Sequence, residues 1–165
     1  MIPQTESRGT GVLDENIPAR FTRRTQWVNW CYEKRGEDLT KVPYTPGTKR
    51  RASSTDLMTW RPFKEALEAY EASAPITYDG VGFMFCSADP FVGIDLDGCR
   101  NPETGDIAEW ATKIIDSVSD KYVEASPSGT GVHVITRGTL RVGRKKGPLE
   151  VYGQERFFTF TGVKL

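Results

Sequence analysis

The chain has 165 residues, a length typical of one domain with a sizeable core. Its 22 basic and 22 acidic residues balance, so a nucleic-acid partner would have to be held by a local basic patch rather than by net charge. No apolar run is long enough to cross a membrane, and three widely spaced cysteines favour neither a disulfide framework nor a zinc knuckle. We therefore expect a reduced, cytoplasmic protein without a membrane span.

The N-terminal third combines one strand with a long loop. Residues 1–18 are polar and rich in turn-forming residues, which predicts a tail or a loosely docked lead-in before a domain at 19–165. The aromatic, β-prone run QWVNWCY at 26–32 predicts a strand. Residues 33–56 contain two prolines, two glycines and many basic residues, so we predict a functional or disordered loop there.

The rest of the chain reads as two helices among short strands. Helical spacing predicts a helix at 59–70 capped by Thr59, and another at 107–118 capped by Asp106. The strand-like runs at 80–87 and 91–97 are separated by Ala-Asp-Pro, which predicts a hairpin. Four more strands are predicted at 121–125, 131–136, 149–153 and 156–162. This order indicates an α+β fold, a largely antiparallel sheet carrying helices.

Three of these strands place ionisable groups opposite their apolar residues. Asp95 and Asp97 alternate with apolar neighbours in GIDLD, and His133 and Glu150 do the same in GVHVI and PLEVY. If the strands are neighbours, the four side chains converge on one open surface. Three carboxylates suit Mg²⁺ or Mn²⁺, and two such ions about 3.5–4 Å apart can promote phosphoryl or nucleotidyl transfer. For each position alone, the solvated face of an ordinary strand is the better explanation, and only the four positions together make a metal site equally good.

The turn before His133 and two basic segments could bind phosphates. The turn in EASPSGTGVHV is rich in hydroxyls and could form an anion nest, although a plain hairpin turn is the alternative. Basic residues cluster at Lys41, Lys49, Arg50 and Arg51, and again at Arg141, Arg144, Lys145 and Lys146. Such clusters can hold a nucleic-acid backbone, although most are solvated surface. Trp27, Trp30 and Tyr44 could stack on bases, although a strand Trp usually lies in the core.

Together these motifs resemble the archaeo-eukaryotic primase superfamily, in particular the primase–polymerase (prim-pol) domains of phage and plasmid replication proteins. GIDLDGC resembles the acid-x-acid motif, SPSGTGVHV the histidine motif, and LEVYGQERFFTFTG the third acidic motif with the ending of the phage members. QWVNWCY and TKVPYTP resemble the N-terminal part, so the similarity covers roughly residues 20–165. Gly131 stands where Ser is commoner, and Glu150 where Asp is commoner.

The resemblance implies a DNA primase/polymerase with an RRM-like catalytic sheet (about 76–165) beside a small N-terminal α/β unit (about 19–75). It implies two Mg²⁺ or Mn²⁺ ions held by Asp95, Asp97 and Glu150. Residues implied to bind the incoming dNTP or NTP are Ser126, Ser128, Gly129, His133, Lys41, Lys49 and Arg156. Residues expected to contact a single-stranded or primed DNA template are Arg50, Arg51, Arg144, Lys145 and Lys146. Larger members add a helicase region, and the family suggests a viral or plasmid source.

Three other functions fit parts of the pattern. DLDG is also the nucleophile signature of haloacid-dehalogenase-type phosphatases, but that class places it on the first strand of a βαβ fold. A non-catalytic RRM-like nucleic-acid-binding module would normally expose aromatic residues on its sheet, where this chain has acids and a histidine. A related metal-dependent nuclease would share the acidic residues, and an activity assay separates it.

Overall fold

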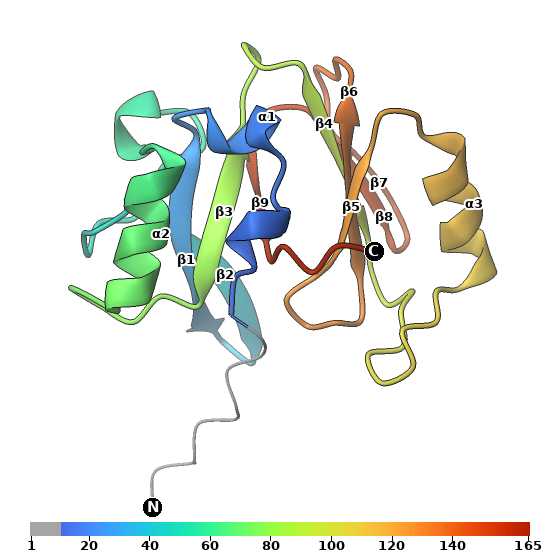
Figure 1. Cartoon of the computed structure of the whole chain (residues 1–165), viewed down its shortest axis with the longest axis horizontal. Helices are drawn as coiled ribbons and strands as arrows, with labels where there is room; N and C mark the ends of the chain where they lie inside the picture. Colours follow the sequence, from blue (N-terminus) through green and yellow to red (C-terminus); the bar gives the residue numbers. More distant parts are fainter. Residues whose placement is uncertain (1–10) are drawn as a thin grey trace, which may run out of the picture.

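Two antiparallel sheets flanked by helices make up residues 11–165, the part of the chain that this computed structural model describes. The strand order is β2-β1-β3-β9 in the four-stranded sheet and β5-β6-β4-β8-β7 in the five-stranded sheet. The two sheets lie beside each other, with α2 on the outer side of one and α3 on the outer side of the other (Figure 1). The predicted α+β class is confirmed.

The four-stranded sheet joins segments from both ends of the chain. Its strands are β1 (Trp27–Arg35), β2 (Asp38–Tyr44), β3 (Gly80–Phe85) and β9 (Arg156–Phe160). The loop predicted at 33–56 is wrong, because β2 lies inside it and forms a hairpin with β1. Gly36, at φ 64°, lies in the tight turn between them. The charged residues and Pro43 in this segment argued against a strand, but both are common in the edge strand of a sheet, which is the position of β2.

The five-stranded sheet contains β4 (Phe91–Leu96), β5 (Tyr122–Ala125), β6 (Val132–Arg137), β7 (Arg144–Lys146) and β8 (Leu149–Tyr152). The predicted hairpin between 80–87 and 91–97 is wrong, because β3 and β4 belong to different sheets. The buried Asp89 stabilises the crossover by accepting hydrogen bonds from the backbone N–H groups of Cys86 and Phe91. Since β3 and β9 complete the first sheet, the two sheets do not divide the chain near residue 75.

The helices are α1 (Ala19–Thr22), α2 (Phe63–Ala72) and α3 (Glu109–Ser117), with 3-10 turns η1 (Asp14–Asn16) and η2 (Leu57–Thr59). Both predicted caps are wrong, since Pro62 precedes α2 and Ala108 precedes α3. Thr59 instead donates to the Asp56 carbonyl, and Asp106 accepts from Thr104. These short polar side chains bond to local partners in turns. Within residues 11–165, no helix has the length and apolar character needed to cross a membrane.

An aromatic core fills the space between the sheets, and a smaller aliphatic core lies between the five-stranded sheet and α3. Residues 11–18, from the predicted lead-in, contact the first core: Ile17 is buried and the Leu13 N–H donates to the Thr161 carbonyl. Residues 1–10 of that lead-in lie outside the described part. Trp27 and Trp30 are buried, so the prediction that they stack on bases is wrong.

Candidate functional site

A row of five ionisable side chains crosses the whole five-stranded sheet. The strand register pairs Glu124 with His133, His133 with Asp95, Asp95 with Glu150, and Glu150 with Lys145. Because residues directly opposite each other on neighbouring strands share a face, all five side chains lie on one side of the sheet. We call this set the ionisable row. The register confirms the predicted convergence of Asp95, His133 and Glu150.

The row lies on a covered face, so the predicted open surface is wrong. The same face carries Phe91, Tyr122 and Ile135, which pack in the aromatic core against the other sheet. His133 is only 3% exposed, while the Asp95 side chain keeps 27% exposure. Strand alternation identified the face correctly, but it contained no information about the second sheet that covers it.

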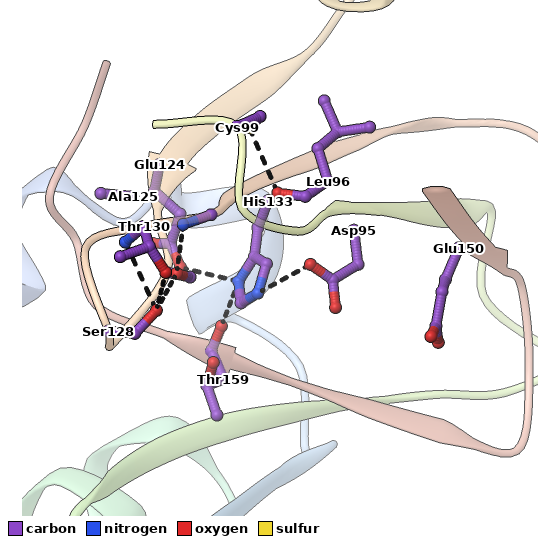
Figure 2. Close-up of polar contacts among 12 residues, drawn as sticks. Asp95, Leu96, Cys99, Glu124, Ala125, Ser128, Thr130, His133, Glu150 and Thr159 are labelled. Atoms are coloured by element: carbon purple, nitrogen blue, oxygen red, sulfur yellow. Dashed lines mark hydrogen bonds and ion pairs between the residues drawn. The ribbon is translucent and has the colours of Figure 1, made fainter. Parts of the chain in front are cut away.

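His133 is held on three sides. Its Nδ1 lies 3.0 Å from the Thr159 carbonyl oxygen and 3.6 Å from Oε1 of Glu124. Its Nε2 lies 3.7 Å from Oδ1 of Asp95, and its ring centroid lies 5.2 Å from that of Phe158. Figure 2 shows the imidazole between the carboxylates of Glu124 and Asp95, with the Thr159 carbonyl beside it. The ring therefore links β9 of the first sheet to the acids of the second.

Lys41 approaches the acidic end of the row from β2. Burial raises the pKa of Asp95. The negative charges of Asp97 and Glu150 raise it further, whereas the neighbouring His133 and Lys41 oppose the increase. Burial lowers the pKa of Lys41, while Asp95 and Asp97 counteract the change. The Lys41 ammonium also lies 5.9 Å from the centre of the Trp30 ring. The structure thus brings this predicted nucleotide-binding lysine beside the acid-x-acid motif.

Glu150 is held by donors on its other side. Its carboxylate pairs with Lys145, accepts a 2.6 Å hydrogen bond from the Tyr152 hydroxyl and lies 3.5 Å from Arg156. Burial works to raise the pKa of Glu150, but the hydrogen bonds from Lys145 and Tyr152 outweigh it and hold the pKa below its usual range. Lys145, predicted to contact nucleic acid, is thus engaged by Glu150. Arg156 also packs 4.4 Å from the centre of the Tyr152 ring.

A cavity of about 430 Å³ lies between the row and the four-stranded sheet. Its charged and polar lining includes Lys41, Asp95, His133, Glu150, Arg156 and Thr159. The hydroxyl of Thr159 is buried and has no hydrogen-bond partner within residues 11–165. Because buried polar atoms in folded proteins are nearly always paired, this hydroxyl is an exception among the residues of the cavity wall.

Other predicted residues lie away from this cavity. Ser126, Ser128 and Gly129 lie in the turn that connects β5 to β6, where the two serine hydroxyls bond each other. Gly131 fits there because a Cβ would lie 3.0 Å from the Leu96 carbonyl oxygen. The nucleotide-binding role predicted for this turn stays a prediction.

The remaining basic residues are also outside the cavity wall. Lys49 and Arg50 are exposed beyond β2, and Arg51 pairs with Glu33. Arg144 and Lys146 are exposed on the edge strand β7. An exposed position is compatible with the phosphate contacts predicted for Arg50, Arg144 and Lys146, which stay predictions.

Three residues of the site were not predicted from the sequence. Glu124 is fully buried at the end of the row. Tyr152 contacts Glu150, and Thr159 contacts His133. Alternation in YVEA could have placed Glu124 on the face opposite Val123, but its position next to the SPSG turn favoured reading it as part of the turn. The Thr159 contact is made by a backbone carbonyl, which every residue type has, so the sequence cannot indicate it.

The carboxylate oxygens at the acidic end are the ligand type that a hard divalent cation prefers, but in this conformation the three carboxylates do not converge on one point. Asp95 and Glu150 are register partners, and Asp97 follows β4 directly. The Glu150 carboxylate is turned toward Lys145, Tyr152 and Arg156. Accordingly, no three His, Cys, Asp or Glu side chains between residues 11 and 165 are grouped closely enough to hold a metal ion.

The phosphatase alternative lacks structural support, since β4 is antiparallel to both of its neighbours and so is not part of a parallel sheet.

Comparison with known proteins adds an independent observation. No family model matches the chain. The chain is similar to a protein of Nitratiruptor phage NrS-1 named DNA Primase-polymerase, with 38% identity over 158 residues. The alignment covers 88% of this chain but only 20% of the phage protein, so the chain spans about a fifth of its relative.

Proposed function

The chain is a homologue of a phage DNA primase-polymerase, as its motifs predicted, and on this premise we propose that it is a template-directed nucleotidyltransferase. The observation that carries the proposal is the register of Asp95, His133 and Glu150 along one wall of a cavity. Residues 19–165 would form the catalytic domain, with residues 11–18 docked against it. The whole relative is about five times longer, which leaves room for a helicase region in a full-length protein.

Asp95, Asp97 and Glu150 are the residues that would hold Mg²⁺ or Mn²⁺. When bound, the metal would supply positive charge at the α-phosphate and lower the pKa of the attacking 3′-hydroxyl. For Glu150 to contribute, its carboxylate has to leave Lys145 and turn toward Asp95. Burial, with smaller contributions from Asp97 and Glu150, raises the pKa of Asp95, and a bound cation would offset the cost of keeping this carboxylate ionised.

Lys41, Arg156 and His133 would bind the triphosphate of the incoming dNTP or NTP. All three line the cavity, and cations fixed beside the reacting phosphates stabilise the charge that develops in the transition state. The unpartnered Thr159 hydroxyl adds one neutral hydrogen-bonding group in the same wall. Lys145, once released from Glu150, would be free to join them.

The template would be single-stranded or primed DNA held outside the cavity. Arg50, Arg144 and Lys146 are exposed basic side chains, and each phosphate contact that they make would strengthen the salt dependence of binding. Because the net charge of the chain is zero, template affinity depends on such local groups.

Extension of a labelled primer on a single-stranded template, with dNTPs and Mg²⁺ or Mn²⁺, tests the proposal. We expect metal-dependent extension by the wild type and by the control variant Glu103→Gln/Asp106→Asn, whose acids are on an exposed loop. The double variant Asp95→Asn/Asp97→Asn should add no nucleotide. Extension by that variant overturns the proposal, whereas template binding without incorporation by the wild type favours a binding module, and primer shortening favours a nuclease.

A further inference from the structure

Glu124 forms the buried end of the ionisable row, on the side of His133 away from Asp95. We infer that Glu124 is a positioning residue for His133: together with the Thr159 carbonyl, it holds the Nδ1–H of the imidazole and so keeps Nε2 directed toward Asp95 and the cavity. This inference rests on the proposed function, because it gives the fixed Nε2 a place in the nucleotide-binding cavity. It assigns a role to an acid outside the three predicted metal ligands.

The environment of Glu124 is built for a carboxylate. Its side chain is fully buried, and burial of an unpaired carboxylate is strongly unfavourable. The carboxylate accepts hydrogen bonds of 2.9–3.1 Å from the N–H groups of Thr161 and Gly162 and one of 2.9 Å from the Tyr122 hydroxyl. The remaining polar neighbour is Nδ1 of His133, 3.6 Å from Oε1. A carboxylate fixed by three donors cannot turn away from the imidazole.

The Thr159 carbonyl determines where the ring proton lies. A carbonyl oxygen can only accept, so the 3.0 Å contact with Nδ1 requires the proton to be on Nδ1. The acceptor Oε1 of Glu124 on the same side favours a proton on Nδ1 as well. With Nδ1 held in this way, Nε2 is the ring atom that faces Asp95 and the cavity.

Glu124 also holds the segment that supplies the Thr159 carbonyl. Thr161 and Gly162, which donate to Glu124, follow directly after β9. The same segment is tied to β5 by the hydrogen bond from the Thr161 hydroxyl to the Ala125 carbonyl. Glu124 therefore sets the distance between the Thr159 carbonyl and β6, and it acts on His133 both directly and through that carbonyl.

Nitrogen NMR of the imidazole tests the inference, since His133 is the only histidine in the chain. The sample is ¹⁵N-histidine-labelled protein without nucleotide or metal. In the wild type we expect a proton on Nδ1 that is hydrogen-bonded and exchanges slowly with solvent. Glu124→Gln removes the negative charge beside this proton, so the Nδ1–H should exchange several-fold faster. Tyr122→Phe, which removes one donor but keeps the carboxylate, should retain the slow exchange of the wild type.

The result that overturns the inference is a wild-type ring without a proton on Nδ1, or a folded Glu124→Gln protein whose Nδ1–H exchanges as slowly as that of the wild type. If the Gln variant does not fold, Glu124→Asp is measured instead. This variant keeps the charge but moves it away from the ring, so the same result is expected. Nucleotide addition by Glu124→Gln should fall about 10- to 100-fold, the range typical of residues that orient a functional histidine. Because the NMR measurement needs no turnover, failure of the proposed function would be seen separately, as an inactive wild type.

Discussion

The packing beside the ionisable row predicts a large effect of one methyl group. In Gly93→Ala, the new Cβ would lie 2.6 Å from Cε2 of Phe158 and 2.9 Å from Cε2 of Phe85. Carbon atoms pack at about 3.5–4.0 Å, so the Phe158 ring has to move by about 1 Å. Such overpacking costs about 1–3 kcal/mol. At about 2–4 °C per kcal/mol for a chain of this size, the melting temperature should fall by about 2–12 °C.

The same displacement should reach the reaction, because the Phe158 ring packs against His133. A misplacement of about 1 Å at a catalytic group can lower the rate about 100-fold. Thermal unfolding and primer extension measure both effects. The matched control is Gly11→Ala, whose new Cβ would make its nearest contact at 3.6 Å, with the hydroxyl oxygen of Tyr70. A Gly93→Ala protein with the melting temperature and activity of the wild type would refute the described packing between the aromatic core and the row.

Three further predictions concern the site itself. Burial raises the pKa of Asp95, so the stability contributed by its protonated form is present below the unfolded pKa of about 3.9 and is lost as pH rises through the raised value. In EDTA, Asp95→Asn should therefore be at least as stable as the wild type toward urea at pH 7, and the two should converge at low pH; a less stable variant at pH 7 contradicts this sign. Thr159→Val removes an unpartnered hydroxyl, so stability should hold while the nucleotide KM rises about tenfold, the equivalent of one hydrogen bond; an unchanged KM argues against a ligand contact. Lys145→Met frees Glu150 from its cation, so Mn²⁺ should bind several-fold more tightly in calorimetric titration, and weaker binding would show that Lys145 does not compete with the metal.

Alternation along single strands predicted the row well. In GIDLD, GVHVI and LEVY, apolar neighbours fix the direction of the polar side chain, and register then places Asp95, His133 and Glu150 together. The covering of that face was not predictable in this way. It depends on β9 pairing with β3, more than 70 residues earlier in the chain, and such long-range pairing is not encoded in local pattern.

The errors have similar physical causes. The run at 80–87 is buried on both faces and shows no alternation, and the alternation in 91–97 shows only which face its acids occupy, so neither run shows which strand it pairs with. The strand β2 was hidden by its charges, which suit an edge position. Glu124 was overlooked because a buried carboxylate is recognised by the donors around it, and two of these are backbone N–H groups that follow β9.

Single-nucleotide addition to a primer, on a template whose next base is known, tests the proposed activity most directly. We expect the wild type to add the complementary nucleotide far more often than a non-complementary one, and Asp95→Asn to add neither while keeping its fold. Addition by Asp95→Asn at the wild-type rate would contradict the assignment of the ionisable row as the site of nucleotidyl transfer.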